Sequence, residues 1–182
     1  MADITDIQIA FGTEEQAIKA EEIARTMIKL VYAIDEKDPP AWAADVRRCE
    51  TLAEAYLRYG AAAEDYDPVR NFAYCAILRV HREGKELMID RCGDLVRGFQ
   101  LQGCFAFFPQ LCAACALRFP DLSFEAHCRY EMTVSALEEF HDVRYDGAVF
   151  RTEYRCILED DEGAPDRETF SLAPNGLLQK VL

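Results

Sequence analysis

The stretch Leu122–Met132, with the sequence LSFEAHCRYEM, alternates apolar and polar residues without interruption. Its apolar members are Leu, Phe, Ala, Cys, Tyr and Met, and its polar members are Ser, Glu, His, Arg and Glu. Because successive side chains of a strand point to opposite faces of a sheet, this alternation predicts a strand with one dry and one wet face. Such a sheet needs helices packed against its dry face.

Turn residues outside this stretch predict further strands. Gly84, within Arg-Glu-Gly-Lys, separates two apolar segments and predicts a hairpin. Asp146-Gly147 is typical of a tight hairpin turn and predicts a second hairpin extending to about Leu158. The predicted strands, besides the one above, are Ile4–Phe11, 72–81, 86–92, the two arms of 140–158 and 169–172.

Capping signals predict the helices. Thr13 with Gln16 has the form of a capping box, so a helix should begin here and run to about Asp35. Asp38 before two prolines predicts the start of a second helix, for which Gly60 is a C-cap candidate.

Prolines and acids mark the remaining boundaries. Residues 61–71 are predicted to be a connector, because Pro68 and three acids interrupt the helical periodicity. A short helix should start at Pro109 and end before Pro120, and the segment 99–107 is ambiguous between strand and helix.

Without the short last strand at 169–172, the order of these elements is β-α-α-β-β-α-β-β-β, which predicts an α+β fold with an antiparallel sheet and helices on one face. With the second helix treated as an insertion, the first six elements spell a ferredoxin-like plait, extended by a C-terminal hairpin. We predict a single domain over 1–182. Its parts are an acidic strand-helix-helix front at 1–60, a sheet-rich part at 72–158, and an acidic loop and tail at 159–182.

The segment Arg118–Glu125, RFPDLSFE, resembles a helix-to-strand junction in ferredoxin-like domains of small phage and plasmid proteins. The resemblance covers these eight residues. It implies a mobile-element origin and carries no catalytic residue.

The charge of the chain is −13 over 182 residues and is unevenly distributed. Residues 1–69 hold 15 acids and 7 bases, whereas 70–158 hold 12 acids and 11 bases. Because binding to nucleic acids and anionic membranes needs clustered Lys and Arg, we expect neither direct nucleic-acid nor membrane binding. No apolar run approaches the length of a membrane helix, and an acidic N-terminus unlike a targeting signal predicts a cytoplasmic protein.

The eight cysteines lie within apolar segments and are interpreted as small buried hydrophobes. Cys112 and Cys115 have the spacing of zinc and redox pairs. A zinc site would need Cys104, His127 or Cys128 as further ligands, and neighbours on a strand face opposite sides. We therefore predict core packing, with no metal and no cofactor.

No arrangement typical of a catalytic site is found. His81, His127 and His141 have no evident partners and are predicted to be exposed surface histidines. A nucleophile elbow and a phosphate loop are absent from the sequence. The acidic run 159–162 is interpreted as a solvated loop. The sequence favours a non-enzymatic protein and leaves the question of an enzyme open.

Acidic residues of the helical front are the candidate partner-binding site. They could imitate a phosphate backbone and occupy a basic groove on a partner, or form an ordinary solvated helix face. The candidates are Glu14, Glu15, Glu21, Glu22, Asp35, Glu36 and Asp38. The first hypothesis is thus a protein–protein interaction module, an acidic inhibitor or nucleic-acid mimic, of unknown oligomeric state.

The alternative hypothesis is a small-molecule-binding or enzymatic domain. Its ligand would occupy a cleft between the sheet and the helices, lined by aromatic residues such as Tyr74 and Tyr130.

Overall fold

The computed structural model describes residues 4–67, 79–90, 107–132, 136–158 and 161–181. The first part of the chain contains β1 (Ile4–Phe11), α1 (Glu14–Asp35), α2 (Ala43–Val46), α3 (Leu52–Glu64), β2 (Arg79–Glu83) and β3 (Glu86–Asp90). The second part contains α4 (Phe107–Arg118), β4 (Phe124–Met132), β5 (Leu137–Tyr145), β6 (Val149–Leu158), β7 (Asp161–Glu162), β8 (Asp166–Leu172) and β9 (Leu178–Lys180).

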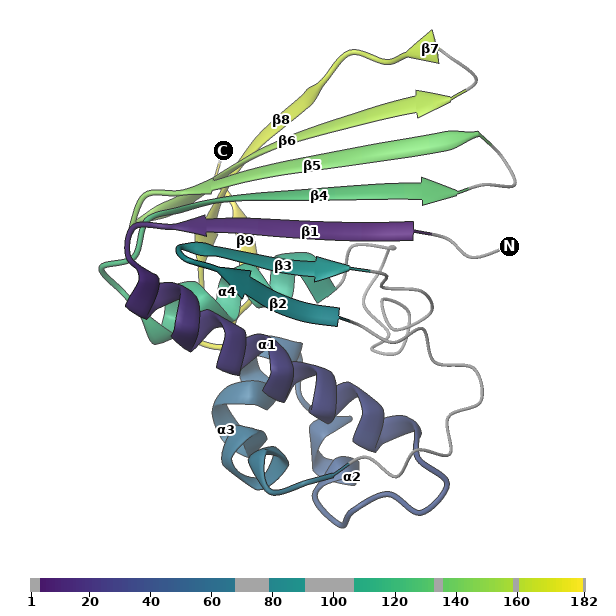
Figure 1. Ribbon diagram of the computed structural model, residues 1–182, viewed down its shortest axis with the longest axis vertical. Helices are drawn as coiled ribbons and strands as arrows, with labels where there is room; N and C mark the ends of the chain where they lie inside the picture. Colours follow the sequence, from purple (N-terminus) through teal and green to yellow (C-terminus); the bar gives the residue numbers. More distant parts are fainter. Residues whose placement is uncertain (1–3, 68–78, 91–106, 133–135, 159–160, 182) are drawn as a thin grey trace.

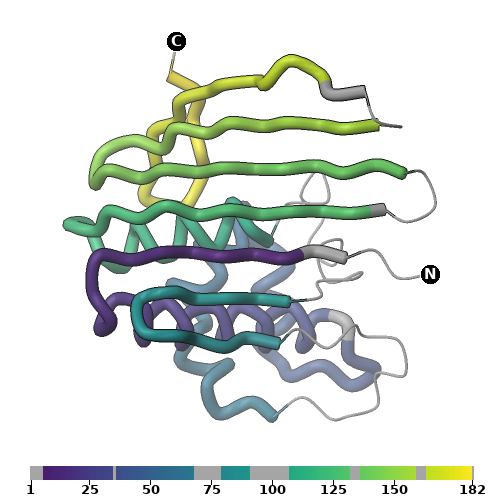
Figure 2. The backbone as a smooth tube through the Cα atoms, turned by 45° about the horizontal axis from the view of Figure 1, so that its top comes forward, coloured from purple at the N-terminus to yellow at the C-terminus, as the bar shows by residue number. Residues whose placement is uncertain are grey.

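The strands form one antiparallel sheet in the order β2-β3-β1-β4-β5-β6-β8-β9, with β7 paired to β6 (Figure 1). All helices lie behind this sheet when it is seen face-on, so they cover a single face (Figure 2). α1 contacts β1, β2 and β3, and α3 contacts α1 and α4. The predicted α+β class is therefore confirmed. Among the described residues, no helix is long and apolar enough to cross a membrane.

The alternation that predicted β4 is confirmed. Phe124, Ala126 and Cys128 are buried on the inner, helix-covered face, and His127 and Arg129 are exposed on the outer face. The inner face carries a cross-strand row of aromatic rings, one from each of five neighbouring strands. This aromatic row consists of Phe11, Phe124, Tyr145, Phe150 and Phe170.

The capping box that predicted α1 is also present. The Thr13 side chain accepts a hydrogen bond from the Gln16 backbone, and the Gln16 side chain accepts one from the Thr13 backbone. The helix follows directly and ends at Asp35, as predicted. α4 begins two residues before Pro109 and ends before Phe119, where Pro120 disfavours helical geometry.

The single second helix predicted to end at Gly60 is wrong. The chain forms the short α2 and the separate α3, because Thr51 caps a new helix by accepting a hydrogen bond from the Glu54 backbone. Gly60 is not a C-cap: it is buried within α3, where an added Cβ would lie 3.2 Å from the Tyr56 ring. The connector thus begins after Glu64, and its residues 68–71 lie outside the described residues.

The chain after β8 turns back onto the helices. Thr51 donates a hydrogen bond to the carbonyl of Asn175, and the Asn175 amide donates one to Glu50 over 2.8 Å. Gly176 has φ +81° and its Cα faces Ala53 at the start of α3. This C-terminal turn, 173–177, fastens the far end of the sheet to the helical layer.

Several predicted segments lie outside the described residues: 72–78, Cys92 and 99–106. β5 starts at Leu137 and forms the predicted hairpin with β6. Asp146 accepts hydrogen bonds from the Ala148 and Val149 backbones, and Gly147 has φ +92°. The last strand is longer than predicted and is followed by β9.

Candidate functional site

The acids proposed for partner binding fall into two groups at opposite ends of α1. Glu14, Glu15, Glu21 and Glu22 occupy its first turns, whereas Asp35 is its last residue. A helix rises 1.5 Å per residue, so the two ends are about 30 Å apart. The structure therefore does not unite the seven candidates in one surface.

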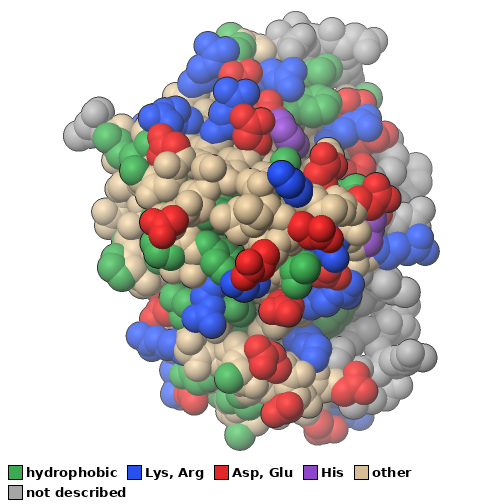
Figure 3. All heavy atoms as spheres, turned by 60° about the vertical axis from the view of Figure 1, so that its left-hand side comes forward, with side chains coloured by type: hydrophobic (Ala, Val, Ile, Leu, Met, Phe, Trp, Pro, Cys, Tyr) green, Lys and Arg blue, Asp and Glu red, His purple; other side chains and the backbone are tan. Residues whose placement is uncertain are grey.

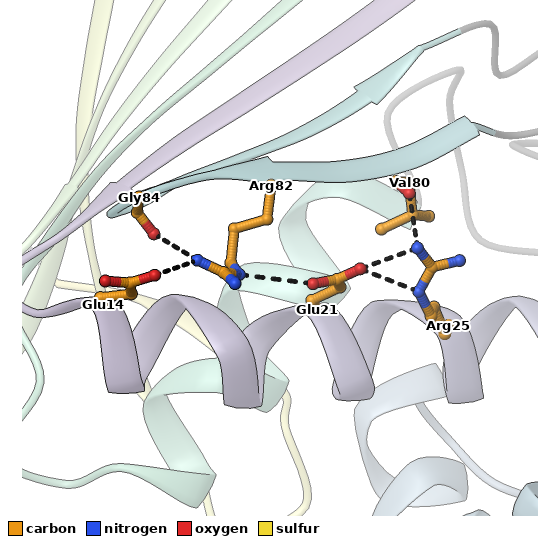
Figure 4. Close-up of polar contacts among 6 residues, drawn as sticks. All are labelled: Glu14, Glu21, Arg25, Val80, Arg82 and Gly84. Carbon is orange, nitrogen blue, oxygen red and sulfur yellow. Dashed lines mark hydrogen bonds and ion pairs between the residues drawn. The ribbon is translucent and has the colours of Figure 1, made fainter.

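Ion pairs within the chain occupy most of the first group (Figure 4). Arg82 on β2 contacts Glu14 over 2.8 Å and Glu21 over 3.5 Å. Glu21 also accepts two hydrogen bonds from Arg25, at 2.7 and 3.1 Å. Glu15 pairs with Lys19 over 2.8 Å. The Arg82 contacts hold α1 against β2, and all three carboxylates have partners within the chain.

The same contacts cover the outer edge of β2, which is a terminal strand of the sheet. Arg25 donates a hydrogen bond of 2.7 Å to the carbonyl oxygen of Val80. Uncovered strand edges can pair with other chains, and charged side chains are a common protection against such pairing. Glu22 is exposed and makes no ion pair with any residue that the structure describes.

The second group of candidate acids, at the C-terminal end of α1, lies next to the C-terminal end of α3. Burial and the nearby Glu36 carboxylate raise the pKa of Tyr66, which follows α3. The Tyr66 ring lies edge-on to Trp42, with centroids 5.7 Å apart. The ends of α1 and α3 therefore converge. We define the acidic end as Glu36, Asp38, Glu64, Asp65 and Asp67.

The electrostatics of the acidic end are unfavourable for isolated helices. Helix C-termini carry a partial negative charge and favour cations, but neither α1 nor α3 has a basic residue in its last turn. Lys29 donates one hydrogen bond of 2.8 Å to the Glu64 carbonyl. Sequence reasoning missed Glu64, Asp65 and Asp67, although the acidic composition of the predicted connector was the available signal.

The thiols of the CxxC motif are buried in the core, as predicted. Burial raises the pKa of Cys115 to about 12 and raises that of Cys112 well above its ordinary value. Cys128 lies close enough to Cys112 to contribute to this rise, and His127 faces the opposite side of β4. Within the described ranges, no three His, Cys, Asp or Glu side chains are placed to hold a metal. Cys75, Cys92 and Cys104 lie outside them.

The expectation that all three histidines are exposed is wrong for His141. The residue lies on the inner face of β5 and is only partly exposed. Its ring packs against Tyr154, with centroids 4.7 Å apart, and the Tyr154 hydroxyl donates a hydrogen bond of 2.8 Å to Glu139. Burial lowers the pKa of His141 to about 4, although Glu139 and Asp142 act in the opposite direction.

This lowered pKa predicts that acid destabilises the protein through His141. The unfolded imidazole has a pKa near 6.5, so between about pH 6.5 and 4 the unfolded state binds more protons than the folded state. Stability should therefore be complete above pH 6.5 and fall by about 2–3 kcal/mol as the pH drops to 4. Urea unfolding of the wild type and His141→Phe across this range measures the difference. Parallel curves for the two proteins would contradict the prediction.

The outer face of the sheet carries ordered rows of charged side chains. Figure 3 shows one side of the molecule, on which acidic and basic side chains are interspersed. The strand register aligns one row of Glu125, Arg144, Arg151 and Thr169, and a second row of His127, Asp142, Glu153 and Arg167. His127 Nδ1 lies 2.6 Å from Asp142 Oδ1. The predicted cross-strand ion pairs include Arg129 with Glu138 and Arg155 with Asp142.

Among the described residues, hollows of about 540, 350 and 360 Å³ open on this face. The one of 540 Å³ lies over β5, β6 and β8 between the two rows. Of the two aromatic residues expected to line a cleft beneath the sheet, Tyr130 is buried on the inner face, and Tyr74 lies outside the described residues.

Comparison with known proteins gives no relative. No protein-family model, curated protein or solved structure matches this chain. The chain's own residues offer two functional features: an acidic end where two helices converge, and an outer sheet face with ordered rows of charge.

Proposed function

We propose that this chain is a non-enzymatic protein–protein interaction module that binds a basic partner through the acidic end, as an inhibitor or nucleic-acid mimic would. The observation that carries the proposal is the convergence of two helix C-termini and five acids, with no base in either last turn. The negative charges of the five neighbouring carboxylates repel each other, and the negative ends of the two helix dipoles add to this repulsion. A cationic partner surface relieves both.

Only some of the candidate acids are available to a partner. Glu14, Glu15 and Glu21 have ion-pair partners within the chain, so a partner would have to displace Arg82, Lys19 or Arg25 to reach them. Asp38, Asp65 and Asp67 are exposed and make no ion pair with any residue in the described ranges. These three are the residues that we expect to contribute most to binding.

The test compares two triple variants in pull-downs from a lysate of the source cell. Asp38→Asn, Asp65→Asn and Asp67→Asn together should abolish most of the capture seen with the wild type. Wild-type capture should itself fall as NaCl rises from about 50 to about 500 mM, because salt screens exposed charges. The captured protein should have a basic surface, which its identification by mass spectrometry reveals.

The matched control removes the same amount of charge elsewhere. Asp6→Asn, Glu83→Gln and Asp121→Asn change three exposed acids that make no ion pair with described residues. This control should bind like the wild type. Equal loss of capture in both triple variants would attribute binding to net charge alone, and salt-independent capture would refute the electrostatic mechanism.

We further propose that β1, α1, β2, β3, α4 and β4 form a ferredoxin-like plait, with α2 and α3 inserted after α1. Support comes from the strand order β2-β3-β1-β4 and its antiparallel pairings. The hairpin of β5 and β6, followed by β8 and β9, then extends the sheet beyond β4.

The cellular setting and the net charge of the protein fit binding to a basic protein partner. A mobile-element protein that acts in the cytoplasm would meet basic, nucleic-acid-handling proteins there. The net charge of −13 argues against direct binding to nucleic acid or to an anionic membrane.

A further inference from the structure

The hollow over β5, β6 and β8 on the outer face has the size of a small-molecule site. Its volume is about 540 Å³, and small-molecule pockets typically measure about 300–1,000 Å³. Val143 and Thr152 line its floor, and their side chains belong to the set that faces the inner side of the sheet. The walls are therefore the charged side chains of the two rows described above.

One wall is cationic. Arg144 and Arg151 are directly opposite each other on β5 and β6, an arrangement of like charges that destabilises a strand pair. Their carboxylate partners are Glu125, at 3.3 Å, and Asp146, at 2.5 Å. A guanidinium has five N–H donors, so both arginines retain donors for an anion placed between them.

The adjoining row supplies acceptors. Asp142 contacts His127 over 2.6 Å and Arg155 over 3.6 Å, while Glu153 contacts Arg167 over 2.7 Å. A carboxylate offers about four lone-pair positions, so both acids retain acceptor capacity. The two rows are two residues apart along each strand, which separates them by about 7 Å.

We propose that this hollow binds a small dipolar metabolite, with a phosphate or carboxylate between Arg144 and Arg151 and hydroxyl or amino donors at Asp142 and Glu153. The charge of the lining supports a dipolar ligand over a polyanion. On the outer side the hollow is lined by three arginines, Arg144, Arg151 and Arg167, and two acids, Asp142 and Glu153. The carboxylates of Glu125 and Asp146 neutralise two of these arginines, so no excess positive charge is left for a nucleic-acid strand. This site is separate from the acidic end and does not depend on it.

Two probe sets test the proposal by titration into ¹⁵N-labelled protein. The first compares 6-aminohexanoate with hexanoate and hexylamine, and the second compares glucose 6-phosphate with glucose and inorganic phosphate. In at least one set, the dipolar probe should bind about tenfold or more tightly than either fragment, because each end adds charge-assisted hydrogen bonds. Amide shifts should be concentrated at 142–144, 151–153 and 167–169.

Variants assign the two ends of the ligand. Arg144→Gln and Asp142→Asn should each weaken the dipolar probe about tenfold. Arg79→Gln removes an exposed arginine from β2 and should change nothing. Amide spectra of the variants check that each is folded.

Three results would overturn the proposal. They are equal affinity for a dipolar probe and one of its fragments in both sets, unchanged affinity in folded Arg144→Gln, and tighter binding of a single-stranded oligonucleotide at the same amides. None of them bears on the acidic end, whose test uses other residues.

Discussion

Replacing Gly176 by alanine is expected to lower the free energy of unfolding by about 3–4 kcal/mol. Gly176 has φ +81°, a conformation that disfavours side chains, and an added Cβ would lie 2.6 Å from Ala53 Cβ and 2.9 Å from Thr51 Oγ1. Either the C-terminal turn or the start of α3 must therefore move. Calorimetry should show a melting temperature about 10 °C lower.

Two controls separate strain from crowding. Gly84 also has a positive φ, +56°, but an added Cβ there meets nothing within 4 Å. Gly84→Ala should thus cost only about 1 kcal/mol. Ala53→Gly should recover part of the loss when combined with Gly176→Ala, and a purely additive pair would show that the two residues do not collide.

Replacing Phe124 by alanine is expected to cost about 3–5 kcal/mol. Phe124 contacts three other rings of the aromatic row: its ring centroid lies 5.9 Å from that of Phe11, 5.5 Å from Tyr145 and 6.2 Å from Phe150. Truncation leaves a cavity among rings on three other strands, and a pleated sheet cannot close it easily. Denaturant unfolding should show a lower midpoint with an unchanged slope.

Phe140 is the matched control on the opposite face of the sheet. It is half-buried beneath Arg155, whose guanidinium lies 5.2 Å from its ring centroid. Phe140→Ala should cost about 1 kcal/mol, because the ring forms no part of the core. Similar losses at Phe124 and Phe140 would mean that both faces of the sheet bear equally on stability.

Local signals predicted the elements that they directly specify. The alternation of Leu122–Met132 needs only one buried face, and the Thr13–Gln16 capping box needs only neighbouring backbone groups. The division of the second helix at Thr51 rests on a single threonine cap, whereas the prolines at 39 and 40 and the glycine at 60 are stronger local signals for the ends of a helix. Gly60 is explained by its close approach to Tyr56, a packing fact that no local pattern contains.

The candidate binding site could not be predicted from the sequence, because it depends on which residues the tertiary structure brings together. Glu14 and Glu21 of α1 are paired with Arg82. Arg82 reaches them only because β2 packs against α1 in the folded structure. Glu64, Asp65 and Asp67, at and just after the end of α3, lie near Glu36 and Asp38 because α3 packs against α1. His141 has acidic neighbours in sequence, yet its register opposite Cys128 places it on the inner face.

The position of β1 has a consequence for synthesis of the protein. β1 leaves the ribosome before the other described strands, yet it lies in the interior of the sheet, where it pairs with β3 on one side and β4 on the other. Ile9 cannot meet its partner Ala126 until the more than 100 residues between them have been translated. The hairpins of β2 with β3 and of β5 with β6 can close locally, whereas the N-terminal strand must wait, so assembly of the sheet is expected to be slow and largely post-translational.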